Sequence, residues 1–223
     1  MIDPMAVAAD VFVAAVGIAT PLALAATGET IAERSGVVNL GVEGAMLFGA
    51  LGGAMGATVA GPAAGLGIGI LAGVLVAALF AAVAIGAGAD QIITGTAVTL
   101  ASVGLTGTIY RQFYGPAGVG LSLPTLPPLP LPILSHTPFI GSALFAQPVT
   151  TYLAVGLIPL SWAFLFRTRF GLTLRAVGED PLAARAAGVP VRATRAVAVL
   201  IGGAFAGLAG ATLVLAQVGT FTE

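Results

Sequence analysis

The chain has 223 residues, of which 58% are hydrophobic and 8% charged, and its formal net charge is −1 at pH 7. Soluble domains carry about 25% charged residues, so this composition excludes an ordinary soluble domain and predicts a membrane protein. The charge balance excludes a nucleic-acid-binding surface. The absence of cysteine excludes disulfides and thiolate metal sites.

Six segments are long and apolar enough to span a membrane, which requires about 20 predominantly apolar residues. They cover residues 5–27, 37–60, 63–86, 91–110, 148–166 and 195–217. Gly61 and Pro62 form a turn signal that separates the second segment from the third. No basic residue precedes the first segment, so we interpret it as a span and not as a cleaved signal peptide. The expected fold class is all-α, with one polytopic transmembrane helix bundle over residues 1–223.

Glycines recur at every fourth position in three of these segments. The repeats are Gly65, Gly69 and Gly73, then Gly49 with Gly53, and Gly203 with Gly207. Small residues at this spacing lie on one face of a helix and let two transmembrane helices approach closely. The spacing therefore predicts tight packing among the second, third and sixth segments.

Polar side chains gather where the second and fourth segments begin. We expect the run GETIAER at residues 28–34 to open the second helix, with Asn39 and Glu43 four residues apart on one face of it. Gln91 and Thr94 open the fourth segment. Polar residues within spans face the bundle interior or a water-filled path. All four are candidates for a substrate pathway or for contacts between helices, and their spacing does not distinguish between these two roles.

The connection at residues 111–147 is rich in proline. Seven prolines between Pro124 and Pro148 exclude a regular helix and favour extended segments. His136 is the single histidine of the chain and has no metal-ligating neighbour in this loop. We therefore expect neither a metal site nor a catalytic site. The sequence also lacks a Walker A motif, so ATP hydrolysis by this chain is not expected.

Six of the eight arginines lie in residues 167–195. Lysine and arginine accumulate on the cytoplasmic side of membrane proteins, so this loop is expected in the cytoplasm. Alternation of the spans then places residues 28–36 and 86–91 on the same side. The proline-rich loop at 111–147 and the N-terminus are expected outside, with Arg111 as the one exception to the charge rule.

The cytoplasmic loop encodes a short helix of its own. Asp180 suits an N-cap, Pro181 the first helical position and Gly188 the residue that stops the helix. A helix of about two turns is unstable alone in water, so it must pack against another surface. That surface is either the membrane and the ends of the chain's own helices, or a groove on a cytosolic protein.

Three motifs carry a resemblance to a known family. They are ERSGVVNLGVEGAMLFGA at 33–50, ADQIITGTAVTLASVGLT at 89–106 and FGLTLRAVGEDPLAARAAGV at 170–189. In this order and spacing, the chain resembles the permease subunits of bacterial ABC importers of the branched-chain amino acid and ribose group. It is most similar to nucleoside or simple-sugar permeases. Members of that family continue for further spans, so the chain looks C-terminally truncated relative to them.

The resemblance implies a partner for the short helix. In such importers a cytoplasmic loop of the permease docks into a groove on a separate ATPase, which uses the ATP, and the permease binds no cofactor. The implied coupling residues here are Glu179, Asp180, Pro181, Ala183, Ala184 and Gly188. The resemblance also implies a second permease subunit, an extracytoplasmic substrate-binding protein or lipoprotein, and a place in the bacterial cytoplasmic membrane.

Three alternatives remain open at this point. A branched-chain amino acid permease would keep the class and change the substrate. An ion-coupled secondary transporter would need mid-membrane carboxylates and two related halves, and the sequence offers only Glu43 well inside a span and no internal repeat. In a non-transporting membrane scaffold, the capped helix would have no groove on a cytosolic protein to bind.

Overall fold

A computed structural model describes residues 4–115, 121–130 and 144–221 of the chain. Within these residues, six helices are long and apolar enough to cross a membrane. The prediction of six spans in an all-α bundle is confirmed. His136 lies outside the described residues.

The spanning helices differ from their predicted ranges mainly at their ends. They are α1 (Pro4–Glu33), α2 (Val42–Ala60), α3 (Pro62–Ala81) with a π-helical turn (Ala82–Gly86), α4 (Gln91–Tyr114), α6 (Val149–Arg167) and α9 (Val191–Thr212), which continues as a π-helical segment (Leu213–Val218). Two shorter helices, α7 (Arg169–Glu179) and α8 (Pro181–Ala186), lie between α6 and α9. As predicted, the second and third spans separate at Gly61, and Pro62 is the first residue of α3.

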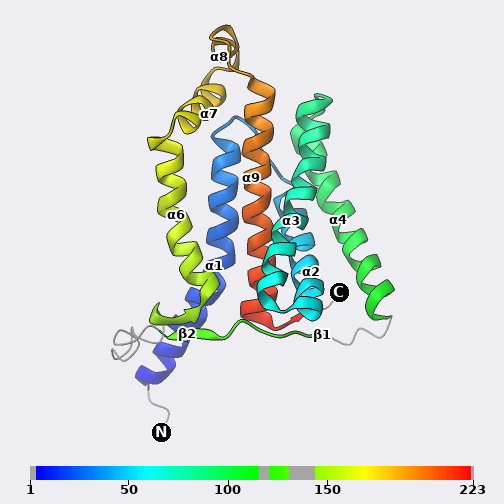
Figure 1. The fold of residues 1–223 in the computed structure, drawn as a ribbon, viewed down its shortest axis with the longest axis vertical. Helices are drawn as coiled ribbons and strands as arrows, with labels where there is room; N and C mark the ends of the chain where they lie inside the picture. Colours follow the sequence, from blue (N-terminus) through cyan, green and yellow to red (C-terminus); the bar gives the residue numbers. More distant parts are fainter. Residues whose placement is uncertain (1–3, 116–120, 131–143, 222–223) are drawn as a thin grey trace.

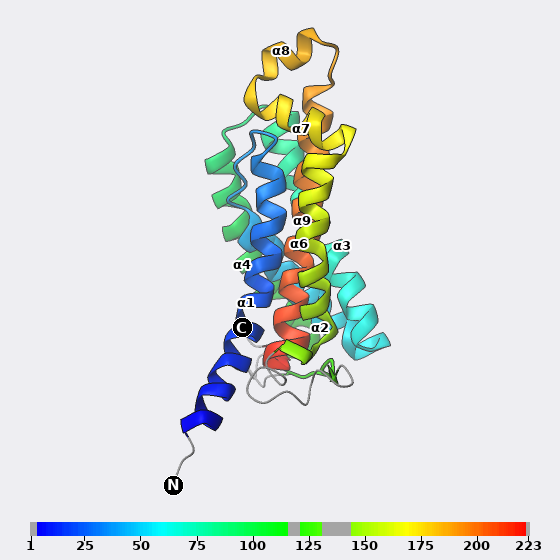
Figure 2. The same ribbon diagram turned by 90° about the vertical axis from the view of Figure 1, so that its left-hand side faces the viewer.

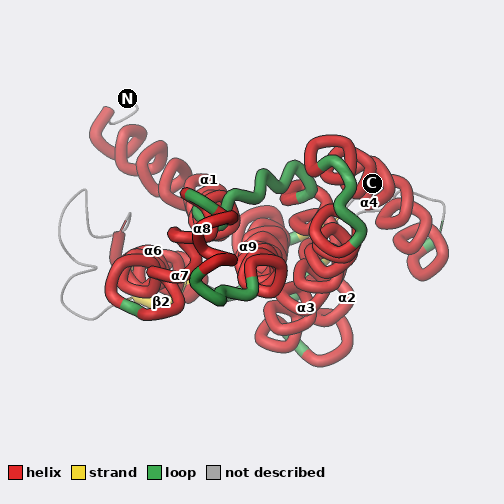
Figure 3. Tube along the Cα trace, turned by 90° about the horizontal axis from the view of Figure 1, so that it is seen from above, coloured by secondary structure: helices red, strands yellow, loops and turns green. Residues whose placement is uncertain are grey.

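Helix α9 stands at the centre of the bundle. It packs against α1 on one side and against α2 and α3 on the other, while α6 and α4 form the two outer edges (Figures 1 and 3). Two thirds (67%) of the most apolar window of α9 is buried, compared with 28% for α6 and 33% for α4. The outer helices therefore leave broad apolar faces for lipid or for other protein.

Glycine makes the close packing of α2, α3 and α9 possible. A Cβ on Gly49 of α2 would lie 2.6 Å from the Cα of Gly207 in α9, and a Cβ on Gly73 of α3 would lie 2.6 Å from the same atom. Gly53 meets Ala211 of α9 at 2.9 Å in the same way. The predicted glycine contacts among these three segments are confirmed, because any larger side chain would push the helices apart.

The two ends of the bundle differ in structure. Helices α7 and α8 cap one end, together with the C-terminal end of α1 and the turn between α3 and α4 (Figures 1 and 2). At the opposite end, β1 (Leu121–Ser122) pairs with β4 (Thr220–Phe221), and β2 (Pro128–Pro130) pairs with β3 (Ala146–Pro148). Within the proline-rich loop these strands are extended, as its composition predicts, whereas α4 continues into the loop as far as Tyr114.

One predicted helix boundary is wrong. The polar run at residues 28–34 does not open the second helix, because α1 continues through Glu33 and a turn follows that ends at Gly36, which has positive φ (79°). Helix α2 begins only at Val42. Asn39 therefore precedes α2, and it does not share a helical face with Glu43.

Candidate functional site

The segment between α1 and α2, residues 34–41, is not helical although it lies within the bundle; we call it the connector. Ser35 and Val37 are fully buried and Asn39 is 4% exposed. In the hydrocarbon region, irregular backbone is tolerated only where protein or a water-filled cavity surrounds it. The connector therefore needs partners for its backbone N–H and C=O groups.

Side chains from the neighbouring spans supply some of these partners. The Val38 N–H donates to Oε1 of Gln91 at 2.9 Å, and the Asn39 N–H donates to Oε1 of Glu29 at 3.0 Å. Glu29 lies on α1, and Gln91 is the first residue of α4. These two residues thus hold the connector between the first and fourth spans.

The second half of the connector rests on α4. The hydroxyl of Thr99 donates to the Leu40 carbonyl at 3.0 Å, and the Gly41 N–H donates to Oδ1 of Asn39 at 3.0 Å. A Cβ on Gly95 would lie 2.9 Å from the backbone nitrogens of both Leu40 and Gly41. Glycine at position 95 therefore lets the connector lie directly on the α4 backbone.

The start of α2 lies deep in the bundle. Gly44, in its first turn, packs against Ser102 of α4, where an added Cβ would be 3.1 Å from the Ser102 Cβ. Ser102 comes eleven residues after Gln91, the start of α4, which corresponds to about 16 Å along a helix axis. With the start of α4 taken as the edge of a bilayer core about 30 Å thick, the first turn of α2 lies close to mid-membrane depth.

Glu43 occupies this depth and is exposed on the surface of the chain. Beside it is a cavity of about 270 Å³, lined by Glu43, Met46, Leu47, Ala50, Gly210 and Leu213. A carboxylate at mid-membrane depth is costly against lipid and faces a bundle interior or a water-filled path instead. We call this surface, formed by α2 and the end of α9, the Glu43 face.

The four polar residues singled out from the sequence therefore have different environments. Asn39 bonds within the connector and Gln91 bonds to it from α4, whereas Glu43 is exposed on α2. Thr94 is buried on α4, with 7% exposure. Sequence reasoning missed Glu29 as a partner of the connector, because it pairs with a backbone group ten residues away that no spacing rule marks.

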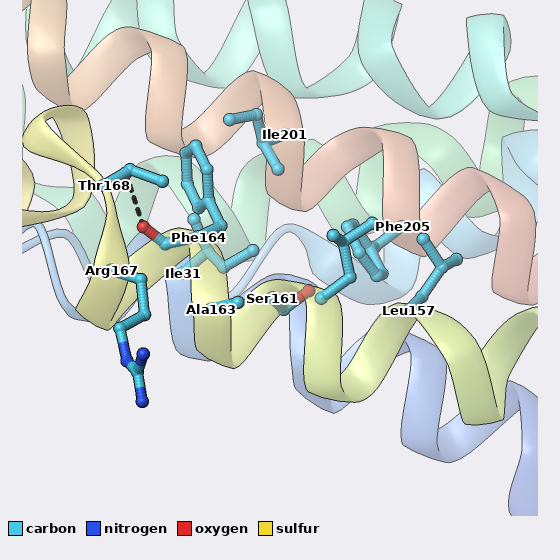
Figure 4. A pocket seen from close by; sticks show the side chains of 10 residues that line it. Ile31, Leu157, Ser161, Ala163, Phe164, Arg167, Thr168, Ile201 and Phe205 are labelled. Atoms are coloured by element: carbon cyan, nitrogen blue, oxygen red, sulfur yellow. Dashed lines mark hydrogen bonds between the residues drawn. The ribbon is translucent and has the colours of Figure 1, made fainter.

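A larger cavity, of about 470 Å³, lies between α1, α6 and α9. Figure 4 shows Phe164, Ile201 and Phe205 along it, with the guanidinium of Arg167 turned away. The Thr168 hydroxyl at its rim already donates to the Phe164 carbonyl, at 2.6 Å. This apolar recess offers few free polar groups for a sugar or nucleoside, so the Glu43 face is the better candidate for a solute pathway.

Helix α8 forms as the sequence predicts. Oδ1 of Asp180 accepts from the N–H groups of Leu182 and Ala183, at 2.9 and 3.0 Å, and Pro181 is the first helical residue. Gly188 has φ 83° and ends the helix. The capped helix thus projects from the arginine-rich end of the bundle (Figure 2).

Ala184 points into the chain and not away from it. With 6% exposure it packs with Val177 of α7 and Val191 of α9 in one small apolar cluster. Leu182 instead is 75% exposed at the tip of the loop, and Ala183 beside it is also exposed. Among these residues, Leu182 and Ala183 are the ones a partner protein can reach.

The amphipathic helix α7 was not expected from the sequence. Its buried face consists of Gly171, Leu174 and Val177, and the Thr168 hydroxyl caps its start by accepting from the Gly171 N–H at 3.0 Å. The signal was available, since a threonine cap precedes apolar residues spaced three and four apart. Within the described residues, no group of three or more histidine and acidic side chains is arranged to hold a metal.

Six apolar helices and an arginine-rich loop with a capped helix define a multi-pass membrane protein. Residues 11–222 match the family described as branched-chain amino acid transport system / permease component. The chain belongs to this family.

Three relatives have printed names that refer to particular solutes. The chain is 46% identical over 217 residues to a putative glucose ABC transporter permease protein of Haloferax volcanii, covering 95% of this chain and 64% of the relative. It is 36% identical over 200 residues to a guanosine ABC transporter permease protein of Bacillus subtilis, with coverage of 86% and 63%. It is 35% identical over 211 residues to a nucleoside ABC transporter permease protein of Lactococcus lactis, with coverage of 91% and 66%.

The chain thus spans slightly less than two thirds of the length of each of these relatives. No solved structure is significantly similar to it.

Proposed function

We propose that the chain is a transmembrane permease subunit of an ATP-binding-cassette importer that carries nucleosides or related simple sugars across the cytoplasmic membrane. The observation that carries the proposal is the family match over residues 11–222, together with relatives named for glucose, guanosine and nucleosides. In this proposal the chain catalyses no reaction and binds no cofactor, and a separate ATPase subunit hydrolyses the ATP.

The orientation follows from charge. Residues 167–195, from the end of α6 to the start of α9, hold six of the eight arginines, and basic segments next to spans stay in the cytoplasm. We therefore propose that α8 faces the cytoplasm, the side of an ATPase. In this orientation the described extended strands and the start of α1 face outward, toward a substrate-binding protein.

The exposed side of α8 is the proposed docking surface. Leu182 is 75% exposed on a helix that Asp180 caps and Ala184 anchors, so its side chain is free to enter a groove on the ATPase. Ala184 takes part indirectly, by fixing α8 on the chain. A charge at Ala184 would therefore disturb the loop itself, whereas a charge at Leu182 tests docking.

The proposed solute path runs along the Glu43 face, against a second permease subunit. In this chain alone Glu43 is exposed, at a depth where lipid is a poor neighbour, and it lines a cavity of about 270 Å³ between α2 and the end of α9. Glu43→Leu is expected to lower uptake while the chain still reaches the membrane. Unchanged uptake would exclude this face as the path.

Reconstituted uptake tests the transport function. Proteoliposomes would contain this chain with the neighbouring genome-encoded ATPase, second permease and binding protein, and labelled guanosine, glucose and leucine would be offered with and without ATP. ATP-dependent accumulation of guanosine or glucose is the expected result. Accumulation of leucine alone would favour the branched-chain amino acid alternative. Accumulation that follows an ion gradient without ATP would contradict the importer proposal.

A further inference from the structure

The end of α7 lies directly on the start of the connector. A Cβ on Gly178 would collide with the carbonyl oxygen of Arg34 and lie 3.2 Å from the backbone nitrogen of Gly36. In the other direction, a Cβ on Gly36 would be 3.3 Å from the Cα of Gly178. Two backbone segments 142 positions apart in sequence therefore touch through a pair of glycines, with no side chain between them.

Arg195 holds the same point from the other end of the loop. It lies in α9, and its Nε donates to the Ser35 carbonyl at 3.1 Å. Its Nη2 lies 3.1 Å from where a Cβ on Gly36 would be. A guanidinium hydrogen bond to a carbonyl that belongs to fully buried Ser35 is charge-assisted and strong.

The short helix α8 is tied to both of these contacts. Val177, Ala184 and Val191 form one buried cluster that joins α7, α8 and the first residue of α9. Close-packed side chains do not slide past one another freely. A displacement of α8 therefore moves the end of α7 and the start of α9 together, and these carry Gly178 and Arg195.

The connector continues from this point to the Glu43 face. After Gly36 its backbone is bound to Gln91, Glu29 and Thr99 in turn, and α2 begins at Val42, one residue before Glu43. The connector is thus a short strip, bonded at several points, between the loop and the first turn of α2.

We propose that Gly36, Gly178 and Arg195 form a transmission joint, through which movement of α8 shifts the connector and with it the start of α2 at the Glu43 face. This inference rests on the proposed function, because it assigns the route by which movement of the ATPase reaches the solute path. Arg195 is then a positioning residue, and the two glycines allow the contact because any side chain would separate the backbones.

Arg195→Ala tests the joint, with Arg192→Ala as its matched control. Arg192 is an exposed arginine three residues earlier on α9, so its loss removes the same charge from the same helix. For Arg195→Ala we expect the ATPase to co-purify as with the unaltered chain, while solute carried per ATP hydrolysed falls about tenfold. For Arg192→Ala we expect both quantities to stay near those of the unaltered chain.

Gly178→Ala provides a second variant that changes no charge. We expect this variant also to carry less solute per ATP hydrolysed, because the added methyl group must displace the connector. Normal uptake per ATP in both Arg195→Ala and Gly178→Ala would overturn the joint. Failure of both variants to accumulate in the membrane would also overturn it, since the contact would then serve folding alone. Absence of ATPase from the unaltered chain would instead sink the proposed function.

Discussion

The glycine-packed centre and the connector hold together in different ways. In α2, α3 and α9, backbones touch over several turns through Gly49, Gly73 and Gly207, so a large area of dispersion contact fixes the helices. The connector touches other backbone at Gly95 and Gly178, and it is otherwise held by hydrogen bonds from side chains on α1, α4 and α9. Close packing over several turns resists movement of the helices, whereas a few hydrogen bonds can be exchanged for others. The rigid centre and the adjustable connector thus lie side by side in one bundle.

The largest effect is expected from adding a side chain to the packed centre. Gly73→Val would put the valine Cβ 2.6 Å from the Cα of Gly207. Overpacking of this kind costs about 3 kcal/mol. The temperature of thermal inactivation in detergent should therefore be well below that of the unaltered chain. Gly67→Val is the control, because Gly67 lies on the same helix with no atom within 4 Å of an added Cβ. Equal losses from both substitutions would refute the contact.

A smaller loss is expected when the connector loses its acceptor on α1. Glu29→Leu leaves the Asn39 N–H without its partner, and an unsatisfied buried donor costs about 2 kcal/mol. Glu29→Gln keeps a carbonyl oxygen able to accept from Asn39, so its thermal stability should stay near that of the unaltered chain. Comparison of the two melting temperatures in detergent measures this difference. A Gln variant as unstable as the Leu variant would show that the negative charge matters more than the hydrogen bond.

The smallest effect is expected at Thr99. Thr99→Val removes the hydroxyl that donates to the Leu40 carbonyl, which is worth about 1 kcal/mol. Thr96→Val is its control on the same helix, because the Thr96 hydroxyl bonds only within α4, to the Ile92 carbonyl. Hydrogen exchange of the connector amides should rise in the Thr99 variant and not in the Thr96 variant. The same exchange in both would mean that Thr99 does not hold the connector.

Some features could be predicted from residues that are close together in the sequence. Asp180, Pro181 and Gly188 specify α8 because capping depends on residues that are neighbours in the chain. The glycine spacing likewise predicted the helix faces in contact, since both partners carry their own repeat. Six spans followed from length and hydropathy alone.

Other features depend on contacts between distant parts of the chain. The break before α2 is stabilised by Gln91 and Thr99, more than fifty residues away, so an unbroken apolar run was predicted to be one helix. Ala184 faces inward because the loop folds back onto Val191, which no pattern within α8 reveals. The same fold leaves Leu182 as the large exposed apolar side chain of the helix.

Co-purification of the ATPase is the most direct test of the central claim. The unaltered chain, Leu182→Glu and Leu182→Met would each be expressed with the neighbouring ATPase, second permease and binding protein, and isolated in detergent. The account predicts that the unaltered chain and Leu182→Met recover the ATPase and that Leu182→Glu loses it while still reaching the membrane. Recovery of the ATPase by Leu182→Glu, or its absence from all three preparations, would contradict α8 as the docking element.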